Sequence, residues 1–287
     1  MRAAQITELG SPPRVVELPN VDGIRVEAVA LNPIDISVGT GVFYGGHPPL
    51  PYVLGVEAAG RREDGRLVYL FGEARGVAKD GFLAERVAVP DDLPLEVPEG
   101  TDPAVAAAVG IAGIAAWVPV AWKAKVGPGD RVLVLGGTGA VGRIAAQAAE
   151  LLGAAKVVAV GRKDLGRIAE EFGDDGFTVC IDPVWGEPLA HALQYAQRHA
   201  RVVHVGQSAG PEAPLRSADV RGQELVIMGH SNFALSREEQ SRAYLELLDH
   251  VTAGRIDIPI QCYPLDRAAE AWERQRSGPG GKVVITL

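Results

Sequence analysis

The order of apolar and polar residues divides the chain into a first part of short strands, a middle part of alternating helices and strands, and a short final part. In the first part, brief apolar runs are separated by glycine and proline, which is typical of strands joined by turns. Strands are predicted at Arg2–Ile6, Val15–Leu18 and Ile24–Leu31. Residues 32–54 are rich in turn-forming residues, and residues 55–90 return to the strand-and-turn pattern.

In the middle part, from Thr101 to Phe233, helical patterns alternate with short runs of branched apolar residues. Such alternation predicts a parallel sheet whose strands are joined by right-handed helical crossovers. The predicted strands are Arg131–Leu135, Lys156–Val160, Phe177–Ile181, Arg201–Val205 and Leu225–Met228.

The final part is predicted to begin with a helix. Ser236 and Glu239 have the spacing of a capping box, and Gly254 is placed to end that helix. A shorter helix from Asp266 to Gln275 and a last strand from Lys282 to Leu287 are expected to follow.

The link after the predicted strand 131–135 carries the clearest functional signal. Gly137, Gly139 and Gly142 have the spacing of a pyrophosphate-binding turn that opens a helix. Glycines at these places permit a tight turn, a close approach of backbone to phosphate and close packing of helix on strand, while the helix N-terminus offers unpaired N–H groups to an anion. The predicted cofactor contacts here are Gly137, Thr138, Gly139, Ala140, Val141 and Gly142.

The end of the next predicted strand bears on the identity of the nucleotide. NAD-binding folds usually place Asp or Glu there to bind the ribose 2′-hydroxyl. This chain has Arg162 and Lys163 instead, and Asp164 comes too late to be the obvious ribose ligand. Arginine binds a phosphate in a fork and lysine binds it as a point charge, so the sequence predicts NADPH rather than NADH. The alternative is that both are ordinary solvated charges on a loop.

Composition narrows the class of protein. The chain has 287 residues, enough for two domains, and its net charge of −8 argues against a general binder of nucleic acid or anionic membranes. Cys180 and Cys262 are far apart, which predicts neither a disulfide framework nor a paired-cysteine metal site. Residues 103–122 are uncharged but mostly Ala, Gly and Val, so a buried helix is favoured over a membrane span. The N-terminus has no apolar signal core, and a cytoplasmic protein is expected.

Several motifs, taken in order, resemble the medium-chain dehydrogenase/reductase superfamily, and within it the zinc-free quinone oxidoreductase branch, which is zeta-crystallin-like. The similarity runs along nearly the whole chain. The segments that carry it are Ala30–Asp35, Gly55–Gly60, Gly81–Pro90, the glycine turn, Val205–Gly210 and Gly281–Val284.

The resemblance implies an α/β fold, with a doubly wound parallel Rossmann sheet plus a β-rich GroES-like catalytic domain. It also implies a cleft for nicotinamide and substrate. The expected division is 1–102 for the first part of the catalytic domain, 103–235 for the NADP-binding domain and 236–287 for the return to the catalytic domain. Residues 171–182 leave room for one strand, where relatives have an extra strand and helix. In the sheet order 3-2-1-4-5-6 the missing third strand is at an edge, so the centre of the sheet is expected to be kept.

The resemblance also bears on zinc. Zinc-dependent relatives carry their ligands at positions that correspond here to Asn32, Val56 and the neighbourhood of Val109. A catalytic zinc needs three ligands from Cys, His or carboxylate, and these positions lack them. Asp35 and Glu57 are retained, but two isolated carboxylates do not make a zinc site, and packing or hydrogen bonding is their alternative role.

Without zinc, the resemblance implies reduction of quinones or α,β-unsaturated carbonyls, because a few hydrogen-bond donors can stabilise the charge that develops on the carbonyl oxygen. The predicted catalytic residues are Asn32 as an amide donor, Tyr44 as a donor of a hydrogen bond or proton, and Asp35. Further cofactor contacts are expected at strand ends. They are Gly206, Ser208, His230, Ser231 and Asn232.

Three alternatives remain open: an enoyl-thioester reductase, a ketone reductase, and a non-catalytic NADPH-binding sensor or structural protein. The expected partner is a small-molecule quinone or enone, with no nucleic acid and no membrane. Relatives dimerise through the last Rossmann strand, which corresponds to residues near Leu225–Met228, so a homodimer is expected.

Overall fold

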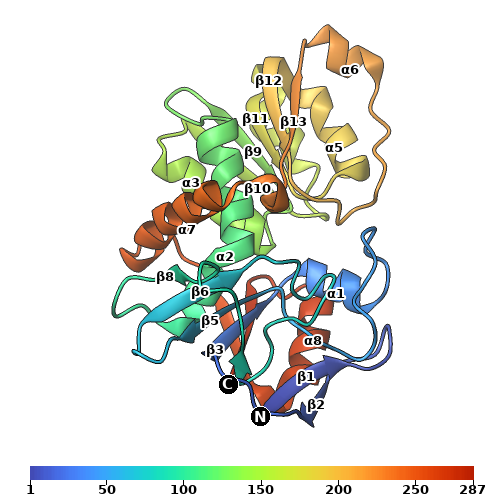
Figure 1. Ribbon diagram of the computed structural model, residues 1–287. Helices are drawn as coiled ribbons and strands as arrows, with labels where there is room; N and C mark the ends of the chain where they lie inside the picture. Colours follow the sequence, from blue (N-terminus) through green and yellow to red (C-terminus); the bar gives the residue numbers. More distant parts are fainter. The chain divides into compact units, whose positions relative to one another are not determined.

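The computed structural model describes residues 1–287, which form two compact units. Unit 1 comprises Met1–Ile111 and Pro259–Leu287, and unit 2 comprises Ala112–Ile258 (Figure 1). Unit 1 is therefore built from both ends of the chain. The return to the first domain is predicted to begin at residue 236, whereas the structure keeps residues 236–258 in unit 2. The reason lies in helix α7 (Arg237–Thr252), whose Glu246 accepts hydrogen bonds from the indoles of Trp117 at 2.8 Å and Trp122 at 3.1 Å.

Unit 1 contains two sheets. One has three strands in the order β2-β1-β4, and the other has seven, with a main path β14-β15-β3-β5-β6-β8 and β7 paired to β3. All pairs are antiparallel except β14 with β15. The strands are β1 (Arg2–Ile6), β2 (Arg14–Glu17), β3 (Ile24–Leu31), β4 (Tyr52–Val53), β5 (Glu57–Arg61), β6 (Leu67–Phe71), β7 (Arg86–Val87), β8 (Leu95–Glu96), β14 (Ile260–Pro264) and β15 (Lys282–Thr286).

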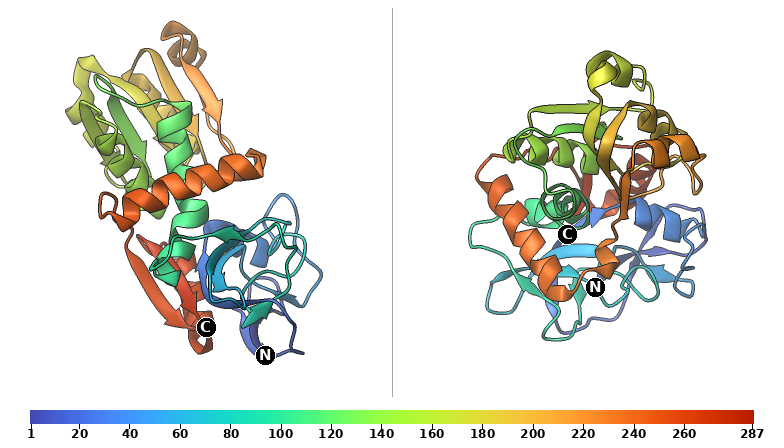
Figure 2. Two further views of the ribbon diagram at one scale, coloured as in Figure 1. Left: turned by 60° about the vertical axis from the view of Figure 1, so that its left-hand side comes forward. Right: turned by 90° about the horizontal axis from the view of Figure 1, so that it is seen from above.

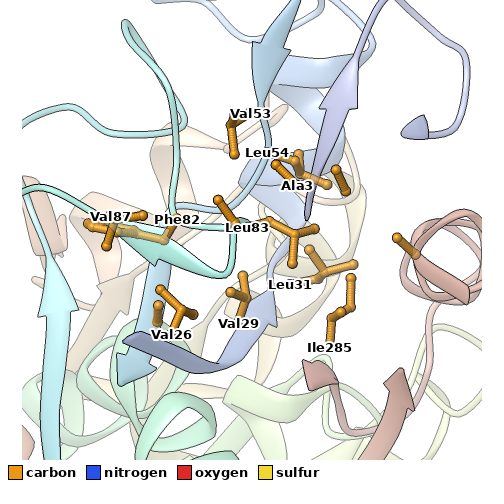
Figure 3. Packing of buried hydrophobic residues seen from close by; sticks show 14 of the residues in the cluster. Ala3, Val26, Val29, Leu31, Val53, Leu54, Phe82, Leu83, Val87 and Ile285 are labelled. Atoms are coloured by element: carbon orange, nitrogen blue, oxygen red, sulfur yellow. The ribbon is translucent and has the colours of Figure 1, made fainter. Parts of the chain in front are cut away.

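Strand β3 lies at the centre of the core of unit 1. Its apolar side chains Val26, Val29 and Leu31 are buried and pack with residues of the 53–54 and 82–87 segments and of β15 (Figure 3). Helices α1 (Pro33–Gly39) and α8 (Ala268–Arg276) complete the unit. A Cβ on Gly39 would lie 2.2 Å from the Cη2 atom of the buried Trp272, so only glycine lets the two helices approach this closely.

Unit 2 is built on a five-stranded parallel sheet in the order β10-β9-β11-β12-β13. This corresponds to 2-1-4-5-6 of the doubly wound order, with the third strand missing at the β10 edge. Residues 171–182 contain one strand, as predicted. The strands are β9 (Arg131–Leu135), β10 (Lys156–Val160), β11 (Phe177–Asp182), β12 (Ala196–His204) and β13 (Val226–Gly229).

Helices flank this sheet, and α3 packs against both β9 and β10. The predicted capping box of α7 is confirmed, because Glu239 N donates to Ser236 Oγ at 3.1 Å and Ser236 N donates to Glu239 Oε2 at 2.7 Å. Figure 2 shows α7 crossing the segment 112–123. The helices are α2 (Pro103–Trp117), α3 (Ala140–Leu151), α4 (Arg167–Phe172), α5 (Gly186–Ala192) and α6 (Ser217–Gly222), with a π-helix at Val118–Lys123 and 3₁₀ turns at Gly173–Asp175, Leu193–Tyr195, Asn232–Ala234 and, in unit 1, Leu265–Arg267.

Helix α2 and the π-helix that continues it form the one segment, Pro103–Lys123, that is long and apolar enough to cross a membrane. Within it, 72% of the most apolar window is buried inside the protein. A buried helix of a water-soluble protein passes the same test, so length and composition here are weak evidence for a membrane span. Gly110 interrupts the helix, with φ −54° and ψ −108°.

Candidate functional site

The glycine-rich link between β9 and α3 is tightly closed. Gly136 has a φ of 64°, a left-handed conformation that glycine adopts without strain. A Cβ on Gly137 would lie 2.6 Å from the Cβ of Ala159 on β10, and one on Gly142 would lie 2.3 Å from the carbonyl oxygen of Gly136. Both positions therefore exclude larger residues. The motif alone predicts the tight turn at Gly137; the structure places it at Gly136 and assigns Gly137 the close contact with β10.

The start of α3 presents backbone donors beside open space. Gly139 is the N-cap residue, no side chain caps the helix, and the first turn has no acidic residue. A Cβ on Gly139 would meet no atom nearer than 3.5 Å. Unpaired N–H groups and the positive end of the helix dipole favour an anion at such a place. Thr138, Gly139, Ala140 and Val141 therefore fit a pyrophosphate group.

The turn after β10 carries two cations without protein partners. Arg162 and Lys163 are exposed, and neither forms an ion pair or a hydrogen bond. Arg167, a turn later, is instead paired with Glu171 at 3.3 Å. An unpaired guanidinium beside an ammonium group has the chemistry that binds a phosphate monoester.

A carboxylate lies at the same turn. Asp164 N donates to the carbonyl oxygen of Gly161 at 3.1 Å, and the turn places Asp164 Oδ2 3.3 Å from where a Cβ on Gly161 would be. Its late position in the chain argues against a role as ribose ligand, but the turn brings its carboxylate back beside the strand end. The turn after β10 therefore carries both a carboxylate that could bind a ribose hydroxyl and cations that could bind a 2′-phosphate.

The other predicted cofactor contacts lie at the carboxyl ends of β12 and β13. Gly206 is packed closely, since a Cβ there would lie 3.0 Å from the carbonyl oxygen of Pro183, and the exposed Ser208 has its Oγ 3.5 Å from the same oxygen. Ser231, after β13, is exposed. These residues follow strand ends, as the sequence indicates, and their contacts with a cofactor stay a prediction.

His230 and Asn232 form a buried pair after β13. His230 Nε2 lies 2.9 Å from Asn232 Oδ1, and the side chains are 8% and 7% exposed. Because the amide oxygen accepts, Nε2 carries the proton, and Nδ1 is left as a buried acceptor without a partner. Burial lowers the pKa of His230 to about 4, so its imidazole is neutral near pH 7.

Unit 1 holds a buried polar network centred on Glu57. This carboxylate accepts hydrogen bonds from Asn32 Nδ2 at 2.7 Å, Tyr69 Oη at 2.8 Å, Ile111 N at 2.6 Å and Lys282 Nζ at 3.1 Å. Glu57 is completely buried and Lys282 is 2% exposed. The network joins the N-cap of α1 to β5, β6, α2 and β15, so it links both ends of the chain inside unit 1.

This network changes the interpretation of Asn32. Its Nδ2 donates to Glu57 and to the carbonyl oxygen of Ala30, and its Oδ1 accepts from Lys282 Nζ at 2.7 Å. Both amide hydrogens and the amide oxygen are thus occupied. These contacts make Asn32 a member of the network, and its donation to a substrate carbonyl stays a prediction.

Asp35 and Tyr44 differ in their surroundings. Asp35 is completely buried and accepts from Asn32 N at 2.8 Å and Val56 N at 3.1 Å, so it fixes the start of α1, and burial raises its pKa to about 7. Tyr44 is 87% exposed and its ring contacts that of Phe43, with centroids 4.5 Å apart. Of the three predicted catalytic residues, only Tyr44 has a polar group free to meet a substrate.

The residues present do not fit a zinc ion. Val56 and Val109 are buried and apolar, and the Asn32 amide is fully bonded. The nearby carboxylates are bonded as well, Glu57 to Lys282 and its other partners and Asp35 to backbone N–H groups. No group of three or more His, Cys, Asp or Glu side chains lies together anywhere in the chain. The donor set for a catalytic zinc is therefore lacking.

Several polar residues of these sites could not be identified from the sequence. In the sequence, Lys282 is noted only as part of the motif Gly281–Val284, and Tyr69 is not noted at all. Spacing along the chain does not show that both side chains reach Glu57. Asp182 and His204, which end β11 and β12, form a contact of 3.2 Å at the carboxyl edge of the parallel sheet. Their one sequence signal is a polar residue at the end of an apolar strand: Asp182 follows the predicted strand 177–181, and His204 is the next-to-last residue of the predicted strand 201–205.

Comparison with known proteins defines the class. A family model described as zinc-binding dehydrogenase matches residues 152–285, a span that contains none of the three positions discussed for zinc. The chain is similar to a quinone oxidoreductase of Lama guanicoe, with 29% identity over an alignment of 325 positions that covers 100% of this chain and 98% of that protein. A quinone oxidoreductase from Thermus thermophilus, whose structure was determined alone and with NADPH, superimposes with a TM-score of 0.82, 27% identity and full coverage of both chains.

The chain is also similar to proteins whose names indicate other activities. A structure of an NAD-dependent alcohol dehydrogenase superimposes with a TM-score of 0.87 at 25% identity over the whole of both chains. Part of a large phenolphthiocerol/phthiocerol polyketide synthase polypeptide of Mycobacterium tuberculosis is 26% identical over 92% of this chain, which corresponds to 13% of that protein.

The two units and the buried network thus define a two-part α/β protein with a Rossmann-type sheet and a GroES-like β-rich unit. Over its full length the chain is similar to proteins of the medium-chain dehydrogenase/reductase superfamily, and quinone oxidoreductases are among these relatives.

Proposed function

We propose that this protein is an NADPH-dependent, zinc-independent oxidoreductase that reduces quinones or α,β-unsaturated carbonyls by hydride transfer. The observation that carries the proposal is the uncapped turn 136–142 followed, after the next strand, by the unpaired Arg162 and Lys163. The relatives, which include quinone oxidoreductases and structures determined with NADPH, support it.

In this proposal, different residues of the chain bind the cofactor and donate to the acceptor. The N–H groups at the start of α3 hold the pyrophosphate, and Arg162 and Lys163 hold the 2′-phosphate. The bound nicotinamide supplies the hydride. Tyr44 is the proposed donor of a hydrogen bond or a proton to the carbonyl oxygen of the acceptor. The buried Glu57 network ties together segments from both ends of the chain within unit 1.

Consumption of NADPH in the presence of a panel of quinones, enones, enoyl thioesters and ketones tests the reaction. The match to part of a polyketide synthase favours keeping enoyl thioesters in that panel. Turnover of quinones or enones above the other classes supports the proposal, and faster turnover of enoyl thioesters or ketones replaces it with the corresponding reductase. Tight binding of NADPH with no turnover across the panel favours a sensor or structural role.

The choice of nucleotide is tested by two variants of the β10 turn. Arg162→Ala is expected to raise the KM for NADPH about tenfold, because a charged hydrogen bond to phosphate is lost, while the KM for NADH changes little. Asp164→Asn is expected to leave the KM for NADPH unchanged. Arg167→Ala is a matched control, since Arg167 is already paired with Glu171. A wild-type preference for NADH that Asp164→Asn abolishes would overturn the assignment of NADPH.

We also propose that two copies associate through β13, the last strand of the parallel sheet. This strand is an edge of the sheet, and Val226 and Ile227 are 47% and 36% exposed. An edge with unpaired backbone groups and exposed branched side chains is a template for pairing with another strand. A second copy of β13 supplies a matching edge in a symmetric dimer.

A further inference from the structure

Asp182 and His204 form a dyad at the carboxyl edge of the parallel sheet in unit 2. Asp182 is completely buried, and its Oδ1 accepts hydrogen bonds from Val184 N at 3.0 Å and Trp185 N at 2.8 Å. Its Oδ2 lies 3.2 Å from His204 Nδ1. One oxygen of the carboxylate is thus held by the backbone, and the other is aimed at the imidazole.

This arrangement fixes the orientation and the tautomer of His204. A carboxylate oxygen can only accept, so Nδ1 of the neutral ring carries the proton and Nε2 is left as an acceptor. Nε2 has no partner within the protein, and the His204 side chain is 28% exposed. The ring is therefore held from behind and presents one hydrogen-bonding atom outward.

Trp185 packs beside the dyad, and its backbone is strained. Its indole packs on the His204 ring with centroids 4.2 Å apart. Trp185 also has a φ of 61°, in the left-handed region that is unfavourable for a bulky residue. Such strain persists where the surrounding structure demands it, and it is concentrated at functional sites.

The dyad lies next to the glycine turn. A Cβ on Gly136 would lie 2.8 Å from Val184 Cγ1, and Val205 N donates to the carbonyl oxygen of Asp182 at 2.8 Å. The order of the strands reverses at β9, and ligands of such sheets bind at this point outside the carboxyl ends. Arg162 and Lys163, after β10, mark the side of the adenosine phosphate, so the other half of a dinucleotide extends toward β11 and β12.

We propose that His204, positioned by Asp182 and flanked by Trp185, binds the nicotinamide riboside half of the dinucleotide, with Nε2 accepting a hydrogen bond from a ribose hydroxyl or the carboxamide N–H. This inference rests on the proposed function, because it requires that the turn 136–142 bind a dinucleotide. Asp182 acts through His204 and is a positioning residue.

The test compares two probes on the full-length protein: NADPH, which contains both halves, and adenosine 2′,5′-bisphosphate, which lacks the nicotinamide riboside. His204→Asn keeps a donor near Nδ1 and removes Nε2, and it is expected to raise the Kd for NADPH about 5- to 10-fold while leaving the Kd for the bisphosphate within about twofold. His204→Gln, which restores a polar atom near Nε2, is expected to recover part of the loss. His199→Asn is the matched control, since His199 lies earlier on β12 and its side chain is 66% exposed.

Asp182→Asn tests the positioning role through a double-mutant cycle. It is expected to weaken NADPH binding about threefold in the wild type and to add no further loss to His204→Asn, because its effect passes through the imidazole. Equal losses for both probes, no loss for NADPH, or independent effects of Asp182→Asn and His204→Asn would each overturn the inference. Failure of the proposed dinucleotide site is distinguishable, since the wild type itself would then bind neither probe, and a failure of turnover alone would leave the binding of both probes intact.

Discussion

Lys282 Nζ lies 3.1 Å from Glu57 Oε1 inside unit 1, and the two side chains are 2% and 0% exposed. Lys282 belongs to the last strand of the chain and Glu57 to β5, so the pair joins segments 225 residues apart. Each charge is satisfied only by the other and by Asn32, Tyr69 and the backbone. A buried ion pair contributes little net stability when complete, but removal of one partner leaves a desolvated charge without compensation.

We expect Lys282→Met to lower the free energy of unfolding by about 3–5 kcal/mol, measured by urea denaturation at pH 7. Combining it with Glu57→Gln removes the stranded charge and is expected to recover a large part of that loss. Lys79→Met is the control, because Lys79 forms an exposed pair with Glu73 whose removal should cost no more than about 1 kcal/mol. Equal losses for the buried and the exposed lysine would refute the argument.

Gly110 lies against the same network. A Cβ on Gly110 would lie 2.0 Å from Glu57 Oε2 and 2.2 Å from Tyr69 Oη, and the position interrupts α2. Gly110→Ala should therefore destabilise the protein by roughly 1–3 kcal/mol through overpacking, although alanine normally stabilises a helix. Gly127→Ala, where a Cβ would meet no atom within 4 Å, is the control in the same denaturation experiment. A stabilised Gly110→Ala variant would show that the network shifts freely.

The raised pKa of the buried Asp35 leads us to expect that the stability of the protein depends on pH. Burial raises the pKa of Asp35 to about 7 in the folded protein, above its value near 3.9 in an unfolded chain. Between these values the folded state binds a proton that the unfolded state does not, so this group's contribution is fully present below about pH 4 and is lost as pH rises through 7. Relative to the wild type, Asp35→Asn should therefore gain stability, by up to roughly 4 kcal/mol, between pH 4 and pH 8. The difference between the two urea-unfolding curves as a function of pH checks it, and parallel curves would contradict it.

Tyr44 is the one predicted catalytic residue whose side chain is exposed. If its hydroxyl donates to the acceptor, Tyr44→Phe should lower kcat about 100-fold and leave the Kd for NADPH unchanged, because the phenyl ring keeps its contact with Phe43. Steady-state turnover with a reactive quinone and equilibrium titration of NADPH separate the two quantities. An unchanged kcat would place Tyr44 outside the chemistry.

The pattern of apolar and turn-forming residues predicts those strands whose position depends on the local sequence alone. The strands Ile24–Leu31, Arg131–Leu135 and Lys156–Val160 have the predicted bounds, since each is a run of mostly branched apolar residues between turn residues. The missing strand before β11 was likewise visible as a shortage of residues between 171 and 182. Spacing along the chain does not show which distant residues meet in the folded protein. The hydrogen bond from Lys282 to Asn32 could therefore not be predicted. The return of Asp164 to Gly161 depends on turn geometry that composition does not specify.

The exposed edge of β13 leads to the last prediction. Ile227 is 36% exposed and Val226 47%, on a strand whose outer backbone groups have no partner in the sheet. A lysine at this edge places a charge where a second apolar strand would pack, which is how natural edge strands avoid association. Ile227→Lys should therefore convert a dimer into a monomer, measured by sedimentation or light scattering over a range of concentrations, with little change in thermal unfolding of the monomer. Leu245→Lys, at a 38% exposed position on α7, is the matched control and should stay dimeric. A wild type that is monomeric throughout, or an Ile227→Lys variant that still dimerises, would mean that β13 is not the interface.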